Sequence, residues 1–220
     1  MKKSKKRSYI NLAVGLTVIA LAIVGIISII SGASELFTKR LEEENSAKYA
    51  AYEEFIAPVI MNDPDTFDDI SNANISQLIS ISIWSLIEEN SEPDAYEYVD
   101  SGILIPQKDV EKKFGSLFGS DVTLRHCTVD GGEGIEFRYS ESRKGYVIPI
   151  TGITPIYIPK VTSAKVRENT VILTVSYLAS EQWVQDSEGN MVEPEASKVM
   201  EITLFRNQDG SYNVRAIRLV

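Results

Sequence analysis

The chain has 220 residues, a formal net charge of −9 and one cysteine. A net negative charge disfavours nucleic acid and anionic lipid headgroups as main partners, so no nucleic-acid partner is expected. The single cysteine, Cys127, excludes an internal disulfide framework.

The first thirty residues combine a basic tail with a long apolar run. Five Lys and Arg side chains lie within residues 1–8, and Ile10 to Ile30 contains no charged residue. At helical rise the run is about 31 Å long, close to the hydrocarbon thickness of a bilayer. We therefore expect residues 1–8 to be a cytoplasmic tail and residues 9–31 to be a transmembrane helix in the lipid bilayer. The positive-inside rule then places the C-terminal part outside the cell membrane.

A cleaved signal peptide is the alternative interpretation of this N-terminus. Ser31-Gly32-Ala33 offers the small residues that a signal peptidase prefers. The apolar segment of a signal peptide is usually about 7–15 residues long, so the length of this run favours a retained anchor. All 31 acidic residues follow Ala33. An acidic domain without disulfides suggests a single-pass protein of the bacterial envelope, with its N-terminus in the cytoplasm.

Three helices are expected after the apolar run. The first covers residues 34–58, and its second half is amphipathic at helical spacing. Its first half lies in a juxtamembrane helical linker, residues 32–48. Residues 74–90 carry an apolar stripe wide enough for a helix covered on most sides. Pro106 can begin a third helix, and Gly119 can cap its C-terminus.

The remainder of the chain is typical of β structure. A short strand is expected near Tyr98 or Ile103. The longer strands are expected over residues 122–129, 134–139, 145–150, 156–167, 170–178, 199–206 and 211–219. Pro149, Pro155 and Pro159 predict an edge strand or a broken crossover, because proline cannot donate to a central ladder. Residues 182–197 are acidic and predict a long hairpin loop that projects from the sheet.

This order predicts an α+β fold, with helices packed on a curved antiparallel sheet in a domain spanning residues 49–220. The stretch Val110-Glu111-Lys112-Lys113-Phe114-Gly115-Ser116-Leu117-Phe118-Gly119 and the closing strands resemble the nuclear transport factor 2-like (cystatin-like) superfamily. Leu117-Phe118-Gly119-Ser120-Asp121-Val122 and Gly145-Tyr146-Val147-Ile148-Pro149 are similar to segments of membrane-anchored proteins of clostridia-like bacteria. The resemblance implies a cone-like sheet. It does not choose a function, since the superfamily contains enzymes, binding modules and scaffold parts.

The sequence predicts no catalytic, cofactor-binding or metal-binding residues. His126 is the only histidine, and adjacent strand residues point to opposite faces, so a dyad between His126 and Cys127 is geometrically poor. We expect Cys127 to be buried and His126 to be partly exposed. The acidic group Asp63, Asp65, Asp68 and Asp69 could bind Ca²⁺, but its spacing does not match a calcium loop. Turn formation and helix capping are the favoured roles of these aspartates.

Five strand and loop tyrosines are candidates for the lining of a ligand pocket at the open end of the cone. They are Tyr96, Tyr98, Tyr139, Tyr146 and Tyr157. Ordinary cross-strand packing of aromatic side chains is the alternative.

Three functions remain open. The leading one is a non-enzymatic interaction or scaffold module that binds a protein partner or a second copy of the chain. Its layout resembles the single-pass scaffold subunits of bacterial conjugation and secretion machines. The second is a sensor that binds a ligand or peptide at the open end of the sheet. The third, a hydrolase or isomerase, lacks a recognisable acid/base pair in the sequence.

Overall fold

The computed structural model describes residues 45–90, 96–99, 102–150 and 154–220. The chain from Tyr49 to Val220 forms one compact unit. The expected cytoplasmic tail and transmembrane helix lie outside the described residues, as does most of the expected linker. No helix within the described ranges is both long enough and apolar enough to cross a membrane.

Three α-helices carry much of the core. The first runs over residues 45–60, and the others are α2 (Ile75–Glu89) and α3 (Gln107–Phe118). The backbone N–H of Gln77 donates to the Asn74 side chain, which caps the N-terminus of α2. Gly119 ends α3 with a positive φ of 95°, a backbone conformation that glycine adopts without steric cost. Two 3₁₀ turns, η1 (Ile70–Asn72) and η2 (Ser180–Gln182), complete the helical elements of the described chain.

The strands form two larger antiparallel sheets and one isolated ribbon. The five-stranded sheet has the order β1-β2-β5-β4-β3, and the four-stranded sheet has the order β11-β10-β7-β6. The strands of the first are β1 (Glu97–Val99), β2 (Gly102–Pro106), β3 (Val129–Gly132), β4 (Ile135–Ser140) and β5 (Gly145–Ile148). Those of the second are β6 (Tyr157–Arg167), β7 (Thr170–Ala179), β10 (Ala196–Arg206) and β11 (Tyr212–Leu219). The ribbon pairs β8 (Val184–Gln185) with β9 (Met191–Val192).

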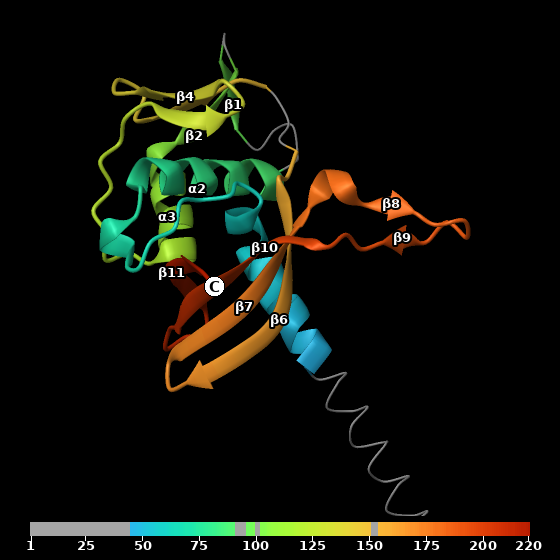
Figure 1. Cartoon of the computed structure of the whole chain (residues 1–220). Helices are drawn as coiled ribbons and strands as arrows, with labels where there is room; N and C mark the ends of the chain where they lie inside the picture. The colour runs from blue at the N-terminus through green and yellow to red at the C-terminus, as the bar shows by residue number, and fades with distance from the viewer. Residues whose placement is uncertain (1–44, 91–95, 100–101, 151–153) are drawn as a thin grey trace, which may run out of the picture. The chain divides into compact units, whose positions relative to one another are not determined.

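Helices α2 and α3 lie between the two larger sheets, and the first helix packs against the four-stranded sheet (Figure 1). On α2, the Trp84 ring meets Phe137 of β4 edge-on, with ring centres 5.1 Å apart. The Asn213 side chain of β11 donates to the last carbonyls of α3 at Gly115 (3.1 Å) and Ser116 (3.2 Å). A continuous apolar core therefore joins both sheets through the helices.

Strand β6 is an edge strand that is protected against further pairing. It contains Pro159, which has no N–H, and its ladder shifts register between Val161 and Ser163. The Val161 N–H donates to the Glu53 carboxylate of the first helix at 2.7 Å. Proline, a bulge and an intramolecular cap are all devices that discourage edge-to-edge association. The prediction of a proline-marked edge is confirmed here.

The predicted α+β class, the second and third helices and most strands are confirmed. Two expectations are wrong. Residues 122–128 form no strand. Side chains from Val122 to His126 alternate between partly buried and exposed, but one face of a segment can be buried without the backbone pairing in a ladder. The single curved sheet is instead two separate sheets. The first helix continues through Pro58 to residue 60.

Candidate functional site

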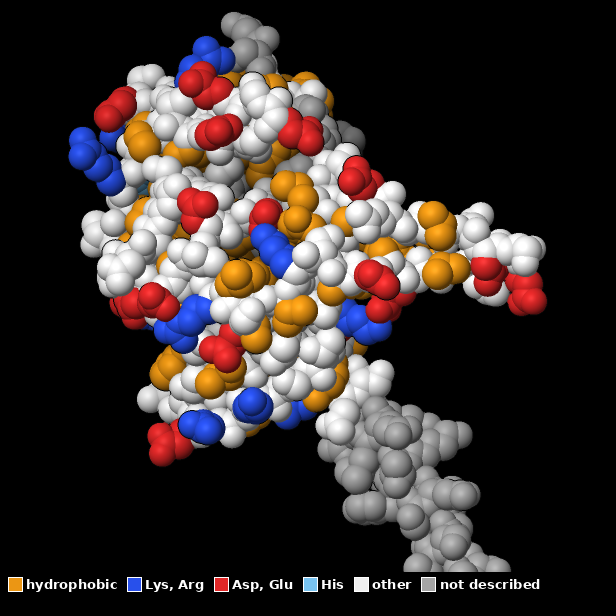
Figure 2. Space-filling model, in the orientation of Figure 1, with side chains coloured by type: hydrophobic (Ala, Val, Ile, Leu, Met, Phe, Trp, Pro, Cys, Tyr) orange, Lys and Arg blue, Asp and Glu red, His pale blue; other side chains and the backbone are white. Residues whose placement is uncertain are grey.

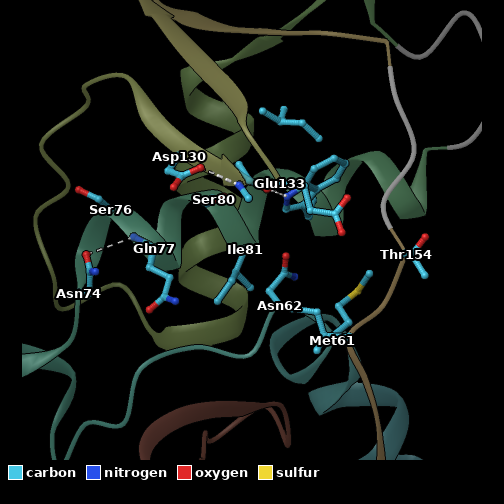
Figure 3. A pocket seen from close by; sticks show the side chains of 15 residues that line it. Met61, Asn62, Asn74, Ser76, Gln77, Ser80, Ile81, Asp130, Glu133 and Thr154 are labelled. Carbon is cyan, nitrogen blue, oxygen red and sulfur yellow. Dashed lines mark hydrogen bonds between the residues drawn. The ribbon is translucent and has the colours of Figure 1, made fainter. Parts of the chain in front are cut away.

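A cavity of about 290 Å³ lies where α2, the β3–β4 hairpin and two connecting segments meet (Figure 3). Its apolar lining comes from both sides of the junction. Among the described residues, its polar lining consists of amides, hydroxyls and carboxylates, without a Lys, Arg or His side chain. The lining residues are Met61, Asn62, Asn74, Ser76, Gln77, Ser80, Ile81, Trp84, Asp130, Gly131, Gly132, Glu133, Ile135, Thr154 and Ile156.

The β3–β4 hairpin is tied to α2 by one buried hydrogen bond. The Trp84 Nε1–H donates to the Gly131 carbonyl at 2.8 Å. Gly131 stands at a register shift between β3 and β4. A Cβ atom at Gly131 would lie 2.9 Å from the Phe137 ring, so glycine is needed for the hairpin to approach the helix. These contacts fix the position of the β3–β4 hairpin, which forms one wall of the cavity, relative to Trp84 and Ile81 of α2, which form its apolar floor.

The side-chain amides on the opposite wall are held in place by the protein's own hydrogen bonds. The Asn62 side chain donates to the Pro58 carbonyl at 2.9 Å. The Gln77 Oε1 accepts from the Asp65 backbone N–H at 3.0 Å. Figure 3 shows both amides beside Ile81. Amide groups fixed in this way are suited to orienting a ligand that carries its own hydrogen-bonding groups.

Two carboxylates lie on the hairpin lip of the cavity. The Asp130 side chain accepts from the Gly132 N–H at 2.8 Å, which fixes one of its oxygens. Glu133 is exposed at the tip of the turn with a φ of 51°, between Gly132 and Gly134, which also have positive φ. The lip therefore carries negative charge, which favours neutral or cationic ligands over anionic ones.

The tyrosines predicted to line a pocket separate into different places. Tyr139 of β4 and Tyr146 of β5 pack together with ring centres 5.1 Å apart. Tyr157 belongs to β6 in the other sheet, and Tyr98 is 57% exposed on β1. Tyr96 lies just before β1 and is partly buried. None of these five tyrosines lines the cavity between α2 and the β3–β4 hairpin.

His126 joins the Tyr139–Tyr146 pair through a polar network. Its Nδ1 is 2.8 Å from the Tyr146 hydroxyl, and its Nε2 is 3.0 Å from the Glu111 carboxylate. Gln107 donates to the same carboxylate at 2.8 Å, and the Tyr139 hydroxyl donates to Gln107 at 2.5 Å. The Tyr146 side chain is fully buried, and burial raises the pKa of its hydroxyl.

This network anchors the segment between α3 and β3 to the helix. His126 is of intermediate exposure, as predicted, although its side chain is only 7% exposed. Cys127 is exposed, so its predicted burial is wrong. Because the hydrogen bonds to Tyr146 and Glu111 hold the histidine inward, the next side chain along this extended segment faces solvent.

We expect a measurable pH dependence of stability from Glu111. Hydrogen bonds from Gln107 and then His126 hold its pKa below the ordinary value of 4.5. A carboxyl with a depressed folded-state pKa contributes stability above its ordinary value and loses it as the pH falls through the folded-state value. The urea midpoint should therefore fall more steeply below about pH 4.5 in the wild type than in Glu111→Gln. Parallel pH profiles for wild type, Glu111→Gln and the exposed control Glu54→Gln would contradict this role.

Tyr157 packs against Tyr177, and a lysine of the same chain lies over both rings. The Lys198 Nζ lies 5.0 Å from the ring centres of both Tyr157 and Tyr177, and it forms an ion pair with Asp63. The Tyr177 hydroxyl is buried without a hydrogen-bond partner among the described residues. Burial raises its pKa, and the nearby Asp63 charge adds to the shift. An internal cation thus occupies the position that a cationic ligand would take between these rings.

The acidic group near residue 65 acts in local structure. Asp69 caps η1 by accepting from the Ser71 N–H at 2.9 Å. Asp65 accepts from the Asn74 side chain at 3.4 Å, and the Arg218 guanidinium donates to Asp68 at 2.5 Å. Within the described residues there is no group of three or more His, Cys, Asp and Glu side chains placed to hold a metal. These contacts agree with the favoured interpretation of turn formation and capping.

No protein family model, curated protein or solved structure matches the chain. The chemistry of the cavity therefore has to be inferred from its own residues.

The sequence did not identify this cavity as a site. It indicated that residues 74–90 form a covered helix, but it did not place residues 130–134 against that helix. The available signal was Trp84, whose indole N–H needs a hydrogen-bond acceptor when the ring is buried. A glycine-rich segment can supply such an acceptor from a closely approaching backbone carbonyl.

Proposed function

We propose that this protein is a non-enzymatic binding module, held at the outer face of a bacterial membrane by residues 9–31. Its folded unit takes a small, partly apolar ligand or peptide segment in the cavity between α2 and the β3–β4 hairpin. The observation that carries the proposal is the composition of this cavity. It combines an apolar floor around Trp84 and Ile81 with fixed amides and an acidic lip.

Size and charge restrict the ligand. A cavity of about 290 Å³ lies at the lower end of the range for small-molecule sites, which suits one side chain or a compact amine rather than a polymer. Asp130 and Glu133 favour a neutral or positively charged group near the hairpin lip. The resemblance to the nuclear transport factor 2-like superfamily is part of this proposal only for the helices and the four-stranded sheet, which contains the closing strands β7, β10 and β11.

The proposal is tested with the purified full chain and two matched probes, phenethylamine and phenylacetate. Trp84 lines the cavity and reports on binding through its fluorescence. We expect saturable binding of the amine, binding of the carboxylate at least about tenfold weaker, and loss of amine binding in Ser76→Phe, which places a ring in the cavity.

Ser142→Phe is the control, because it adds the same ring at an exposed turn that does not line the cavity. Equal binding of amine by wild type and Ser76→Phe would contradict ligand binding in this cavity. Equal binding of amine and carboxylate would contradict the role of the acidic lip.

A scaffold role is the second candidate, and a different observation favours it. The β8–β9 ribbon projects from the four-stranded sheet and presents apolar side chains to solvent (Figure 1). Exposed apolar side chains on a projecting element are typical of interaction surfaces. This candidate does not depend on the cavity.

A further inference from the structure

The projecting ribbon between η2 and β10 is both apolar and acidic. We call residues 181–195 the arm. Val184 is 59% exposed, Met191 is 56% exposed and Val192 is 43% exposed. The arm contains five acidic residues and no Lys or Arg. Figure 2 shows its orange and red side chains together on the ribbon.

The arm has a defined conformation. At its tip, the Asp186 side chain accepts from the backbone N–H groups of Glu188 (2.8 Å) and Asn190 (2.9 Å). At its base, Lys160 of β6 forms an ion pair with Glu193 at 2.6 Å. The paired Val184 and Val192 lie on one face of the ribbon, and Met191 lies on the other. A two-stranded ribbon alone is marginally stable in water, so these polar contacts preorganise the face that carries the two valines.

A surface of opposite charge lies at the other end of the same sheet. We call it the basic corner; it consists of Lys165, Arg167 and Phe205, which the strand register places on one face of the sheet. Strand pairing places Phe205 opposite Thr170, next to the β6–β7 turn, and the Arg206 N–H donates to the Asn169 carbonyl at 2.7 Å.

The corner is exposed and mixes apolar with basic side chains. Phe205 is 43% exposed. Lys165 and Arg167 are also exposed, and Glu168 is the acidic residue of the adjoining turn. The corner therefore complements the arm in both charge and apolar character.

The arm cannot reach the basic corner of its own chain. It leaves the sheet after Ala179, at one end of β7, whereas the corner surrounds Thr170 at the other end. The ten residues of β7 separate the two ends by about 30 Å. The Lys160–Glu193 ion pair also fixes the base of the arm away from the corner.

We propose that the arm of one copy of this chain docks on the basic corner of a second copy. Val184 and Val192 of the arm meet Phe205, and the carboxylates of the arm face Lys165 and Arg167. The two surfaces differ, so the contact is heterologous and leads to a ring or a row of copies unless two copies engage reciprocally. This inference is independent of ligand binding in the cavity.

Disulfide cross-linking of the full chain in membranes tests the proposal. Cys127 is the only cysteine, so Cys127→Ser is the background. Val192→Cys and Phe205→Cys, carried on two differently tagged copies, are co-expressed and oxidised with copper phenanthroline. We expect a mixed dimer at a yield at least about fivefold above that of the control pair Val192→Cys with Tyr98→Cys, whose second cysteine is exposed on the other sheet.

Charge reversal provides the second part of the experiment. Lys165→Glu with Arg167→Glu should lower the yield of mixed dimer about fivefold, and Glu188→Lys with Glu195→Lys on the other copy should restore it. High salt should also lower the yield, because the pairs are near the surface.

Two outcomes overturn the proposal. The first is a mixed-dimer yield no higher than that of the Tyr98→Cys pair, although both cysteines react with a maleimide. The second is cross-linking of Val192→Cys to a different membrane protein without mixed dimers, which would assign the arm to another partner.

Discussion

Replacing Gly102 by alanine should unfold the compact unit or destabilise it by more than about 4 kcal/mol. Gly102 begins β2 with a φ of 151°, and a Cβ atom there would lie 1.8 Å from the Ile148 carbonyl oxygen of β5. A backbone oxygen cannot move aside as the end of a flexible side chain can. The pairing of β2 with β5 would have to open, and α3, which begins directly after β2, would lose its support.

Urea unfolding of the full chain, followed by tryptophan fluorescence, measures this effect, because both tryptophans lie in the compact unit. Gly132→Ala is the matched control. Gly132 also has a positive φ, 84°, but no atom lies within 4 Å of its added Cβ. This control should cost only about 1–2 kcal/mol, the strain of a left-handed alanine. Similar losses in the two variants would mean that the contact with Ile148 is not decisive.

Replacing Trp84 by alanine should lower the free energy of unfolding by about 3–5 kcal/mol. The ring is 1% exposed and packs edge-on against Phe137. Its removal leaves a void between α2 and the five-stranded sheet. It also leaves the buried Gly131 carbonyl without its indole donor. The loss should therefore exceed that of an ordinary buried side chain of the same helix.

Trp84→Phe separates the two contributions to this loss. It keeps most of the apolar volume but removes the hydrogen bond to Gly131, so we expect a cost of about 1–3 kcal/mol. Far-UV circular dichroism during urea unfolding gives both values. If Trp84→Phe were as stable as the wild type, the hydrogen bond would not hold the β3–β4 hairpin. If Trp84→Ala lost less than about 1 kcal/mol, the ring would not be part of the core.

The elements that could be predicted from the sequence are those decided by local signals. The apolar stripe over residues 74–90 predicts the bounds of α2, and Pro106 and Gly119 predict those of α3. These signals succeed because helix caps and the spacing of apolar residues depend on near neighbours in the chain. The strands from residue 156 onward follow for the same reason, since alternation and turn residues are local.

The segment before β3 shows where such signals fail. Val122, Leu124 and His126 alternate with exposed residues as a strand would, yet the segment is held by side-chain bonds to α3 and β5. A polar network replaces the ladder. The pattern of burial therefore predicted which side chains turn inward, but it could not predict which backbone groups would pair.

The arm could be predicted from the sequence, whereas the cavity could not. The sequence predicted a projecting acidic hairpin at residues 182–197, because its composition offers little to bury. It offered five tyrosines as candidates for the lining of a pocket, with ordinary packing as the alternative. The cavity of the structure is lined by α2, the β3–β4 hairpin and the segments that follow the first helix and precede β6.

From the sequence alone follow the α+β class, the boundaries of α2 and α3, the proline-marked edge of β6 and the acidic arm, since each depends on residues close together in the chain. The tertiary structure alone decided that there are two sheets, that Gly131 approaches Trp84 from 47 positions away, and that the arm and the basic corner lie at opposite ends of one sheet. Contacts between distant segments depend on how several weakly specified faces pack together, and no local pattern records that choice.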